Sequence, residues 1–169
     1  MDLPIDNQIT SVDVAFYEMK ATHDDAFRCV LRAARHYTIH PDYIYTILKQ
    51  EAGTTGEYRQ NESDGTHDIG DMQINYETWA REFRRLGYQV DWRRVLKNQC
   101  DNILVGTKII KLRQSTAKDA LTAMANYHWF STASNKQPHL KYKSEILPKY
   151  RAILREKQVF ISTLQLAKN

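Results

Sequence analysis

Apolar residues recur at every third or fourth position along most of the chain, which is the spacing of one buried helical face. The first helix is expected after Asp24, a suitable N-cap, with its apolar positions at Phe27, Val30, Leu31, Ala34 and Tyr37. A second helix is expected to begin at Pro41, which suits a first turn, and to end where Gly53 can take a positive φ.

The same spacing predicts further helices over most of the remaining chain. Asn75 and Asp91 can cap two of them, and others are expected over 101–114 and 117–127. A longer basic helix should then run toward the end of the chain, bent or interrupted at Pro148. We therefore predict an all-α fold of six to eight short helices.

One long stretch has no period. Residues 54–70 contain three glycines and many polar residues, which indicates a long loop with room for one short β-hairpin. Long ordered loops in small domains are often functional.

The chain of 169 residues is long enough for one domain with its own core. We expect an N-terminal arm over 1–22, a main domain over 23–155 and a helical tail over 156–169. No run of 18 apolar residues occurs, so no membrane span is expected. The residues after Met1 are acidic and polar and do not resemble a secretory signal, so the chain is either cytosolic or a mature form with an added initiator Met.

Charge and cysteine content narrow the function only slightly. The net charge of +4 contains no block of like charges, so it favours an anionic partner such as cell wall or nucleic acid only weakly. Cys29 and Cys100 fit no metal-ligand spacing and are either buried thiols or one disulfide. We expect no metal and no cofactor.

Glu51 breaks the apolar pattern of the second helix. It continues the face formed by Ile44, Ile47 and Leu48, at a position where an apolar residue is expected. Burial there should raise the pKa of its carboxyl, which suits a general acid. The simpler interpretation is an ordinary glutamate at a helix end that turns outward and pairs with Lys49 or an arginine.

Two further segments carry residues that suit a sugar-binding cleft. In HDIGDMQIN, Gln73 and Asn75 can donate to and accept from sugar hydroxyl and acetamido groups, while Met72 and Ile74 offer apolar packing for a ring face. The simpler interpretation is a polar turn that caps the next helix through Asn75. In TAMANYHWF, the aromatic side chains of 127–130 belong either to the core or to such a cleft.

These three segments, in this order, resemble the lytic transglycosylase catalytic domain of lysozyme-like fold. The resemblance is closer to its branch encoded with bacterial conjugation and secretion systems. Glu51-Ala52-Gly53 is similar to the family's Glu-Ser-Gly. Residues 68–75 are similar to its Gly-Leu-Met-Gln-Ile-Asn segment with a preceding Asp-Ile. Residues 125–128 are similar to the Tyr-His variant of the family's helix that carries a site tyrosine. The resemblance covers roughly residues 28–150, so 23–155 is expected to be the catalytic domain.

The resemblance implies roles for individual residues. Glu51 is expected to be the catalytic residue, with the Tyr127 hydroxyl near its carboxyl. The residues expected to bind substrate are Gln73, Asn75, Tyr127, Met72, Ile74 and His128. Cys29 and Cys100 sit where members of the branch have paired half-cystines, which implies a disulfide and an oxidising compartment, here the periplasm.

This sequence also departs from the family pattern. Ala52 stands where the family has Ser, Asp71 where it has an apolar residue, and Trp129-Phe130 where a small residue is usual. A charge at Asp71 near Glu51 would raise the pKa of Glu51 further. None of these departures removes the catalytic carboxyl.

For a family member, the expected reaction cleaves the β-1,4 bond between N-acetylmuramic acid and N-acetylglucosamine and closes a 1,6-anhydro ring without water. The partners implied are peptidoglycan glycan strands and proteins of a conjugation or secretion apparatus, with the enzyme as a monomer. Lysozyme-like hydrolysis is the alternative, with Asp64, Asp68 or Glu57 as a second carboxylate. An inactive wall-binding module is a further alternative. A nucleic-acid-binding domain is disfavoured because the basic residues are scattered.

Overall fold

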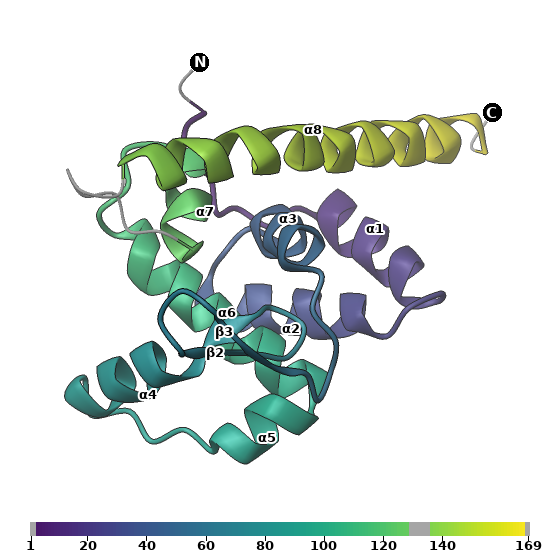
Figure 1. Ribbon diagram of the computed structural model, residues 1–169. Helices are drawn as coiled ribbons and strands as arrows, with labels where there is room; N and C mark the ends of the chain where they lie inside the picture. Colours follow the sequence, from purple (N-terminus) through teal and green to yellow (C-terminus); the bar gives the residue numbers. More distant parts are fainter. Residues whose placement is uncertain (1–2, 129–135, 168–169) are drawn as a thin grey trace.

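The computed structural model describes residues 3–128 and 136–167 (Figure 1). The helices within these residues are α1 Ser11–Ala21, α2 Ala26–Tyr37, α3 Pro41–Glu51, α4 Tyr76–Arg85, α5 Trp92–Lys97, α6 Gln99–Gln114, α7 Ala120–His128 and α8 Lys136–Leu166. The strands are β1 Tyr58–Gln60, β2 His67–Ile69 and β3 Ile74–Asn75, which form one antiparallel sheet in the order β1-β2-β3. The predicted helical fold with a short hairpin in the loop is confirmed.

Helix α6 lies at the centre of the core. It packs against α2, α5 and α7, and its side chains Ile103, Ile109 and Ile110 are fully buried. A disulfide joins Cys29 of α2 to Cys100 of α6, with the two Cα atoms 5.0 Å apart. The choice that the sequence left open is therefore resolved in favour of a bridge between the two central helices.

Helix α8 lies along the upper edge of the molecule, over α3 and α7 (Figure 1). It continues through Pro148, so of the predicted bend or interruption, the interruption is wrong. Proline removes the hydrogen bond to the carbonyl of Ser144, but both residues are exposed and water can replace that bond. Among the described residues, no helix has the length and apolar character needed to cross a membrane.

Half of the segment expected to be an N-terminal arm is a helix packed into the domain. Residues 11–21 form α1, which begins with a capping box between Thr10 and Asp13. Phe16 and Tyr17 are buried in the core at 1% and 0% exposure. A short helix with two buried aromatic residues has too few apolar positions to show a clear period, which is why the sequence pattern missed it.

The helix ends depend on local hydrogen bonds. The side chains of Asn75 and Asp91 accept from the backbone N–H groups of Thr78 and Arg94, as expected of N-caps. Helix α3, by contrast, ends with Ala52 in the left-handed region at φ 46°, so Gly53 is not the residue that supplies the positive φ.

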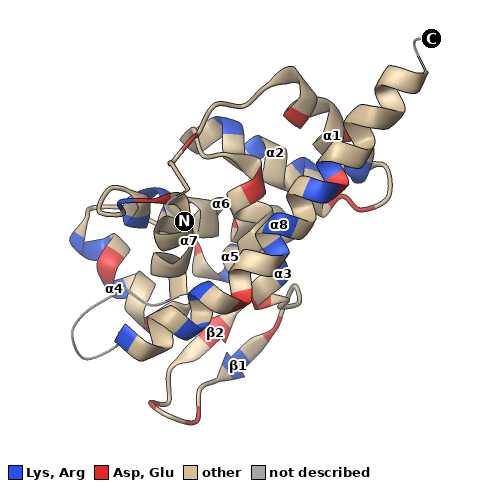
Figure 2. Ribbon diagram, turned by 90° about the horizontal axis from the view of Figure 1, so that it is seen from above, with Lys and Arg blue, Asp and Glu red and all other residues tan. Residues whose placement is uncertain are grey.

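Charged residues are spread over the surface. Seen from above, Lys and Arg lie on several helices and alternate with Asp and Glu (Figure 2). This distribution is typical of a solvated surface and does not suggest a single nucleic-acid-binding face.

Candidate active site

Glu51 lies at the last residue of α3, with its side chain 8% exposed. The Tyr142 hydroxyl, from α8, donates a hydrogen bond of 2.5 Å to Glu51 Oε1. Nδ1 of His128, at the end of α7, lies 3.7 Å from the same oxygen. The rings of His128 and Tyr142 stack with their centroids 4.8 Å apart. Three helices thus meet at one carboxyl group.

Burial is the main influence on this carboxyl, and it raises the pKa of Glu51 to about 7. The hydrogen bond from Tyr142 acts in the opposite direction, because it stabilises the ionised form. The charges of Asp68 and Glu145 raise the pKa, and that of Arg59 lowers it. Near neutral pH the carboxyl can therefore either give or take a proton.

Glu51 does not pair with Lys49, as the simpler interpretation would have it. The Lys49 ammonium lies 3.6 Å from a carboxylate oxygen of Glu156 on α8. The glutamate is turned inward toward aromatic side chains, which is the arrangement expected of a general acid.

The segment after Glu51 is held against the second motif by backbone contacts. The Gly53 N–H donates to the carbonyl oxygen of Asp71 at 3.1 Å. A Cβ added at Gly53 would lie 2.1 Å from the carbonyl oxygen of Gly70, so only glycine permits this approach. Gly53 is therefore needed because its lack of a side chain allows this close packing, whereas the sequence suggested that it ends the helix with a positive φ.

Gln73 stands in a tight turn beside this contact. Its φ of 46° lies in the left-handed region, and its side chain is buried. Its Nε2 donates to the carbonyl oxygen of Gly70 at 2.9 Å and to Glu57 at 3.1 Å, while its Oε1 is buried without a hydrogen-bond partner among the described residues. A non-glycine residue in this conformation is common at ligand-binding positions.

The third motif reaches the second through Tyr127. Its hydroxyl donates to the carbonyl oxygen of Met72 at 2.7 Å. Burial and the charge of Glu51 raise the pKa of the Tyr127 phenol, but its hydrogen bond does not go to Glu51. The tyrosine that contacts the carboxyl is Tyr142.

Four of the six predicted substrate-binding residues line one cavity of about 260 Å³: Gln73, Asn75, Tyr127 and His128. A neighbouring cavity of about 560 Å³ is lined by Tyr142, Glu145 and again His128. His128 therefore belongs to both cavities, and Glu51 lies beside it. The Asn75 side chain is also engaged, since its Oδ1 caps α4 and its Nδ2 donates to Thr66.

Two of the predicted substrate contacts are wrong. Met72 and Ile74 are 0% and 1% exposed and pack in the core, where a sugar ring cannot reach them. Strand alternation places Ile74 inward, and the small Gly106 on α6 leaves room for the Met72 side chain.

The departures from the family pattern also have structural positions. Asp71 is buried and accepts hydrogen bonds of 2.8 Å from Thr55 and Gln99, so its charge is engaged locally. The charges that raise the pKa of Glu51 come instead from Asp68 and Glu145. Trp129 and Phe130 lie outside the described residues.

Sequence reasoning missed Tyr142. The signal available was its place in a buried stripe of α8 with His139 and Ile146, but such a stripe is also typical of an ordinary packed helix. Only the fold shows that this tyrosine, 91 residues away along the chain, reaches Glu51.

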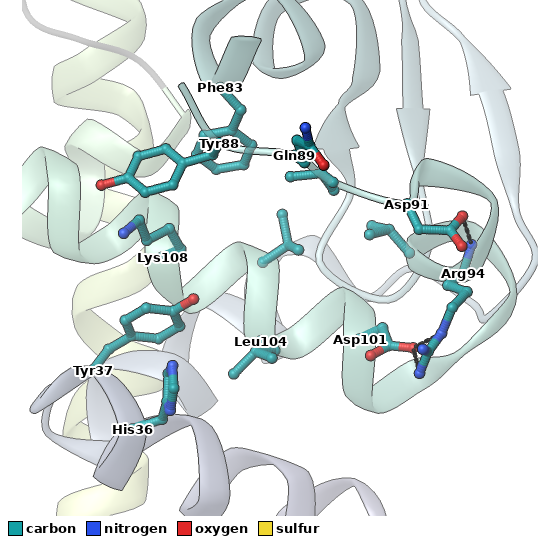
Figure 3. A pocket seen from close by; sticks show the side chains of 13 residues that line it. His36, Tyr37, Phe83, Tyr88, Gln89, Asp91, Arg94, Asp101, Leu104 and Lys108 are labelled. Atoms are coloured by element: carbon teal, nitrogen blue, oxygen red, sulfur yellow. Dashed lines mark hydrogen bonds and ion pairs between the residues drawn. The ribbon is translucent and has the colours of Figure 1, made fainter. Parts of the chain in front are cut away.

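A separate cavity of about 430 Å³ lies between the end of α2, α6 and the loop that joins α4 to α5 (Figure 3). The Lys108 ammonium lies over the rings of Tyr37 and Tyr88 at its edge. The two carboxylates that line this cavity already have partners: Asp101 pairs with Arg94 at 3.0 Å, and Asp91 caps α5. It offers no carboxyl comparable to Glu51.

Residues 28–147 match the sequence model of the transglycosylase SLT domain, and this match spans all three motifs and Tyr142. The chain belongs to the transglycosylase SLT domain family. SLT domains are lysozyme-like and act on peptidoglycan in the cell envelope. Among curated proteins, this chain is similar to the invasion protein IagB of Salmonella typhimurium strains SL1344 and LT2 and of Salmonella typhi. Each is 22% identical over 125 residues, which cover 74% of this chain and 76% of the relative.

Proposed function

We propose that this protein is a peptidoglycan lytic transglycosylase with Glu51 as its only catalytic acid and base. It would cleave the β-1,4 bond between N-acetylmuramic acid and N-acetylglucosamine and leave a 1,6-anhydro-muramic end. The observation that carries this proposal is the buried Glu51 carboxyl, whose pKa of about 7 suits both proton transfers. Membership of the SLT family supports the same substrate class.

In the first step, protonated Glu51 donates its proton to the glycosidic oxygen, and the bond from that oxygen to the anomeric carbon breaks. The substrate's own acetamido group stabilises the cation that develops at this carbon. In the second step, the 6-hydroxyl oxygen of the same sugar attacks the anomeric carbon, and ionised Glu51 takes the hydroxyl proton. The carboxyl is then protonated again.

The surroundings of Glu51 suit each of its two states. Burial stabilises the protonated carboxyl before the first transfer, and the hydrogen bond from Tyr142 stabilises the carboxylate before the second. The glycan strand would pass through the two cavities that share His128, so that the cleaved bond lies beside Glu51. Gln73 and Asn75 would then flank the sugars in the smaller cavity.

The cellular role we propose is local opening of the peptidoglycan in the periplasm for a conjugation or secretion apparatus. The resemblance to the branch encoded with such systems supports this role, as does the similarity to proteins named for invasion. The disulfide between Cys29 and Cys100 supports an oxidising compartment.

Hydrolysis of the same bond is the second candidate function, and Asp68 is the residue that favours it. Its charge acts on Glu51, and it lines the smaller cavity, so it could activate a water molecule. The other two candidates are less suitable: Asp64 is exposed and accepts hydrogen bonds from Thr66, and Glu57 accepts hydrogen bonds from Thr54 and Gln73.

The test is mass analysis of the soluble products released from purified peptidoglycan by the wild type and by Glu51→Gln. We expect the wild type alone to release anhydro-muropeptides. Products heavier by one water would identify a hydrolase and direct attention to Asp68→Asn. Release of nothing by a folded wild type that still binds peptidoglycan would show a binding module.

A further inference from the structure

The buried stripe of α8 contains one charged residue. Its positions follow each other at three and four residues: His139, Tyr142, Ile146, Tyr150, Ile153, Lys157 and Phe160. An apolar residue is expected at the sixth position, but Lys157 stands there with its side chain only 12% exposed.

The Lys157 ammonium lies between two buried carboxylates. Its Nζ is 2.5 Å from Asp13 Oδ1 of α1 and 2.5 Å from Asp42 Oδ2 of α3. The two aspartate side chains are 5% and 1% exposed. The Tyr17 hydroxyl donates to the other oxygen of Asp42, and the His40 ring lies within 3.6 Å of both carboxylates. One cation thus joins α8 to both α1 and α3.

A buried group of this kind is weak evidence for stability, because desolvation of the three charges offsets their attraction. Its best-attested use is to specify one register, since a slipped register leaves charges buried without partners. The apolar contacts of Ile146 and Ile153 are less directional and do not exclude a slip to the same degree. The position of the ammonium therefore suits a role in setting how α8 lies along α3.

The same two helices meet again at the candidate site. Asp42 lies in the first turn of α3 and Glu51 in its last, so the two ends of this helix contact Lys157 and Tyr142 of α8. A change of one residue in the register of α8 would turn its side chains by about 100°. The Tyr142 hydroxyl would then no longer reach Glu51.

We propose that Lys157 is a positioning residue for the candidate active site: by binding Asp13 and Asp42 it sets the register of α8, and that register holds the Tyr142 hydroxyl against Glu51. This inference rests on the proposed function of Glu51. It assigns a role to α1 and to the last turns of α8, which lie outside the matched residues 28–147.

The carboxylates and the imidazole here also have the geometry of a cation site, because ligand atoms of Asp13, His40 and Asp42 lie within 4.8 Å of one another. The Lys157 ammonium already contacts both carboxylates. We therefore assign the positive charge at this position to Lys157.

The test follows the Tyr142 hydrogen bond directly by NMR. In protein with ¹³C-labelled tyrosine, the Tyr142 ring signal is assigned by its loss in Tyr142→Phe. In the wild type this signal should shift as Glu51 titrates, and the shift should be absent in Glu51→Gln. Lys157→Met alone leaves two buried carboxylates uncompensated and is expected to unfold, so the test variant is Lys157→Met with Asp13→Asn and Asp42→Asn.

We expect this charge-free triple variant to fold and to lose at least half of the Glu51-linked shift. Glu156→Gln is the matched control, because Glu156 is the neighbouring residue on α8 and forms partly buried pairs with Lys20 and Lys49, not with Asp13 or Asp42. It should keep the full shift, and so should Lys157→Arg. A folded triple variant with the full shift, or a wild type without any shift, overturns the proposal.

Kinetics separate this proposal from the proposed function. With an active wild type, the triple variant should lower kcat at least fivefold and change KM less than twofold. When the three substitutions are added to Tyr142→Phe, kcat should fall less than twofold below that of Tyr142→Phe alone, because the three substitutions act through Tyr142. Independent, additive losses would contradict the proposal. An inactive wild type would instead disprove the proposed function, while the NMR result would still decide the role of Lys157.

Discussion

The carboxyl of Glu51 is subject to two opposing influences. Burial favours its neutral form, and the Tyr142 hydroxyl favours its ionised form. Neither alone would suit a group that must first give a proton and then take one. The balance between them leaves the pKa of Glu51 at about 7, where both transfers are accessible at neutral pH.

This raised pKa should make the protein less stable as the pH increases. The carboxyl titrates near 4.5 in the unfolded chain and at about 7 in the folded one, so the folded state binds more protons between these values. Stability is therefore lost as the pH rises from 4.5 through 7, by about 3.5 kcal/mol at about 1.4 kcal/mol for each pH unit.

Glu51→Gln should remove this loss. We expect the variant to be more stable than the wild type by about 3 kcal/mol at pH 8, with the difference disappearing below pH 4.5. Urea unfolding at both pH values measures it. If the free energies of unfolding of Glu51→Gln and the wild type differ by the same amount at pH 4 and pH 8, the carboxyl is not desolvated as described.

Tyr142→Phe should raise the pKa of Glu51, because the ionised carboxyl loses its donor. The alkaline limb of the kcat/KM profile, where the acid form is lost, should move up by about one pH unit. We expect kcat to fall by about tenfold, since the base of the second step is no longer stabilised. Tyr150→Phe is the control: Tyr150 is on the same helix and packs against Tyr43, away from Glu51, so its profile should match the wild type.

At the scale of helices and strands, the sequence pattern predicts what depends on neighbours along the chain. The apolar spacing locates most helices, and Asn75 and Asp91 cap theirs because an N-cap needs only the next three residues. The inward turn of Glu51 follows from the same periodicity. Tyr142 could not be found in this way, because its contact joins two helices far apart in sequence.

The buried positions of Met72 and Ile74 were missed for a related reason. Their segment is attached to α6 by Asn102, which accepts from the Met72 N–H at 2.8 Å and donates to the carbonyl oxygens of Ile69 and Val95. This side chain replaces backbone pairing that the turn cannot make for itself. No local pattern marks an asparagine as having this role.

Asn102→Ala should therefore destabilise the protein by about 3 kcal/mol, because it leaves several buried backbone groups without partners. Asn98→Ala is the matched control: Asn98 caps the same helix at the surface, and its loss should cost about 1 kcal/mol. Denaturant unfolding of the two variants compares these values. Equal losses would mean that the turn does not depend on Asn102.

At the scale of the whole molecule, residues outside the matched SLT domain contribute to the same core. The Ala120 N–H donates to the carbonyl oxygen of Leu3, which ties the N-terminal segment to the start of α7. Phe16 of α1 packs edge to face on Phe160 near the end of α8. The predicted boundaries at residues 22 and 155 therefore do not coincide with changes in packing.

The disulfide acts at this scale as well, because it closes a loop of 71 residues that includes Glu51 and the sheet. In the chain-entropy description, a bridge over this length stabilises the folded protein by about 4 kcal/mol. Dithiothreitol should therefore lower the urea midpoint of the wild type to that of the Cys29→Ala, Cys100→Ala double variant, which should itself not respond. Because α2 and α6 still pack against each other and carry buried apolar residues such as Val30 and Ile103, we expect the double variant to fold and remain active at low temperature. A wild-type midpoint that is the same with and without reductant would show that the bridge does not constrain the unfolded chain.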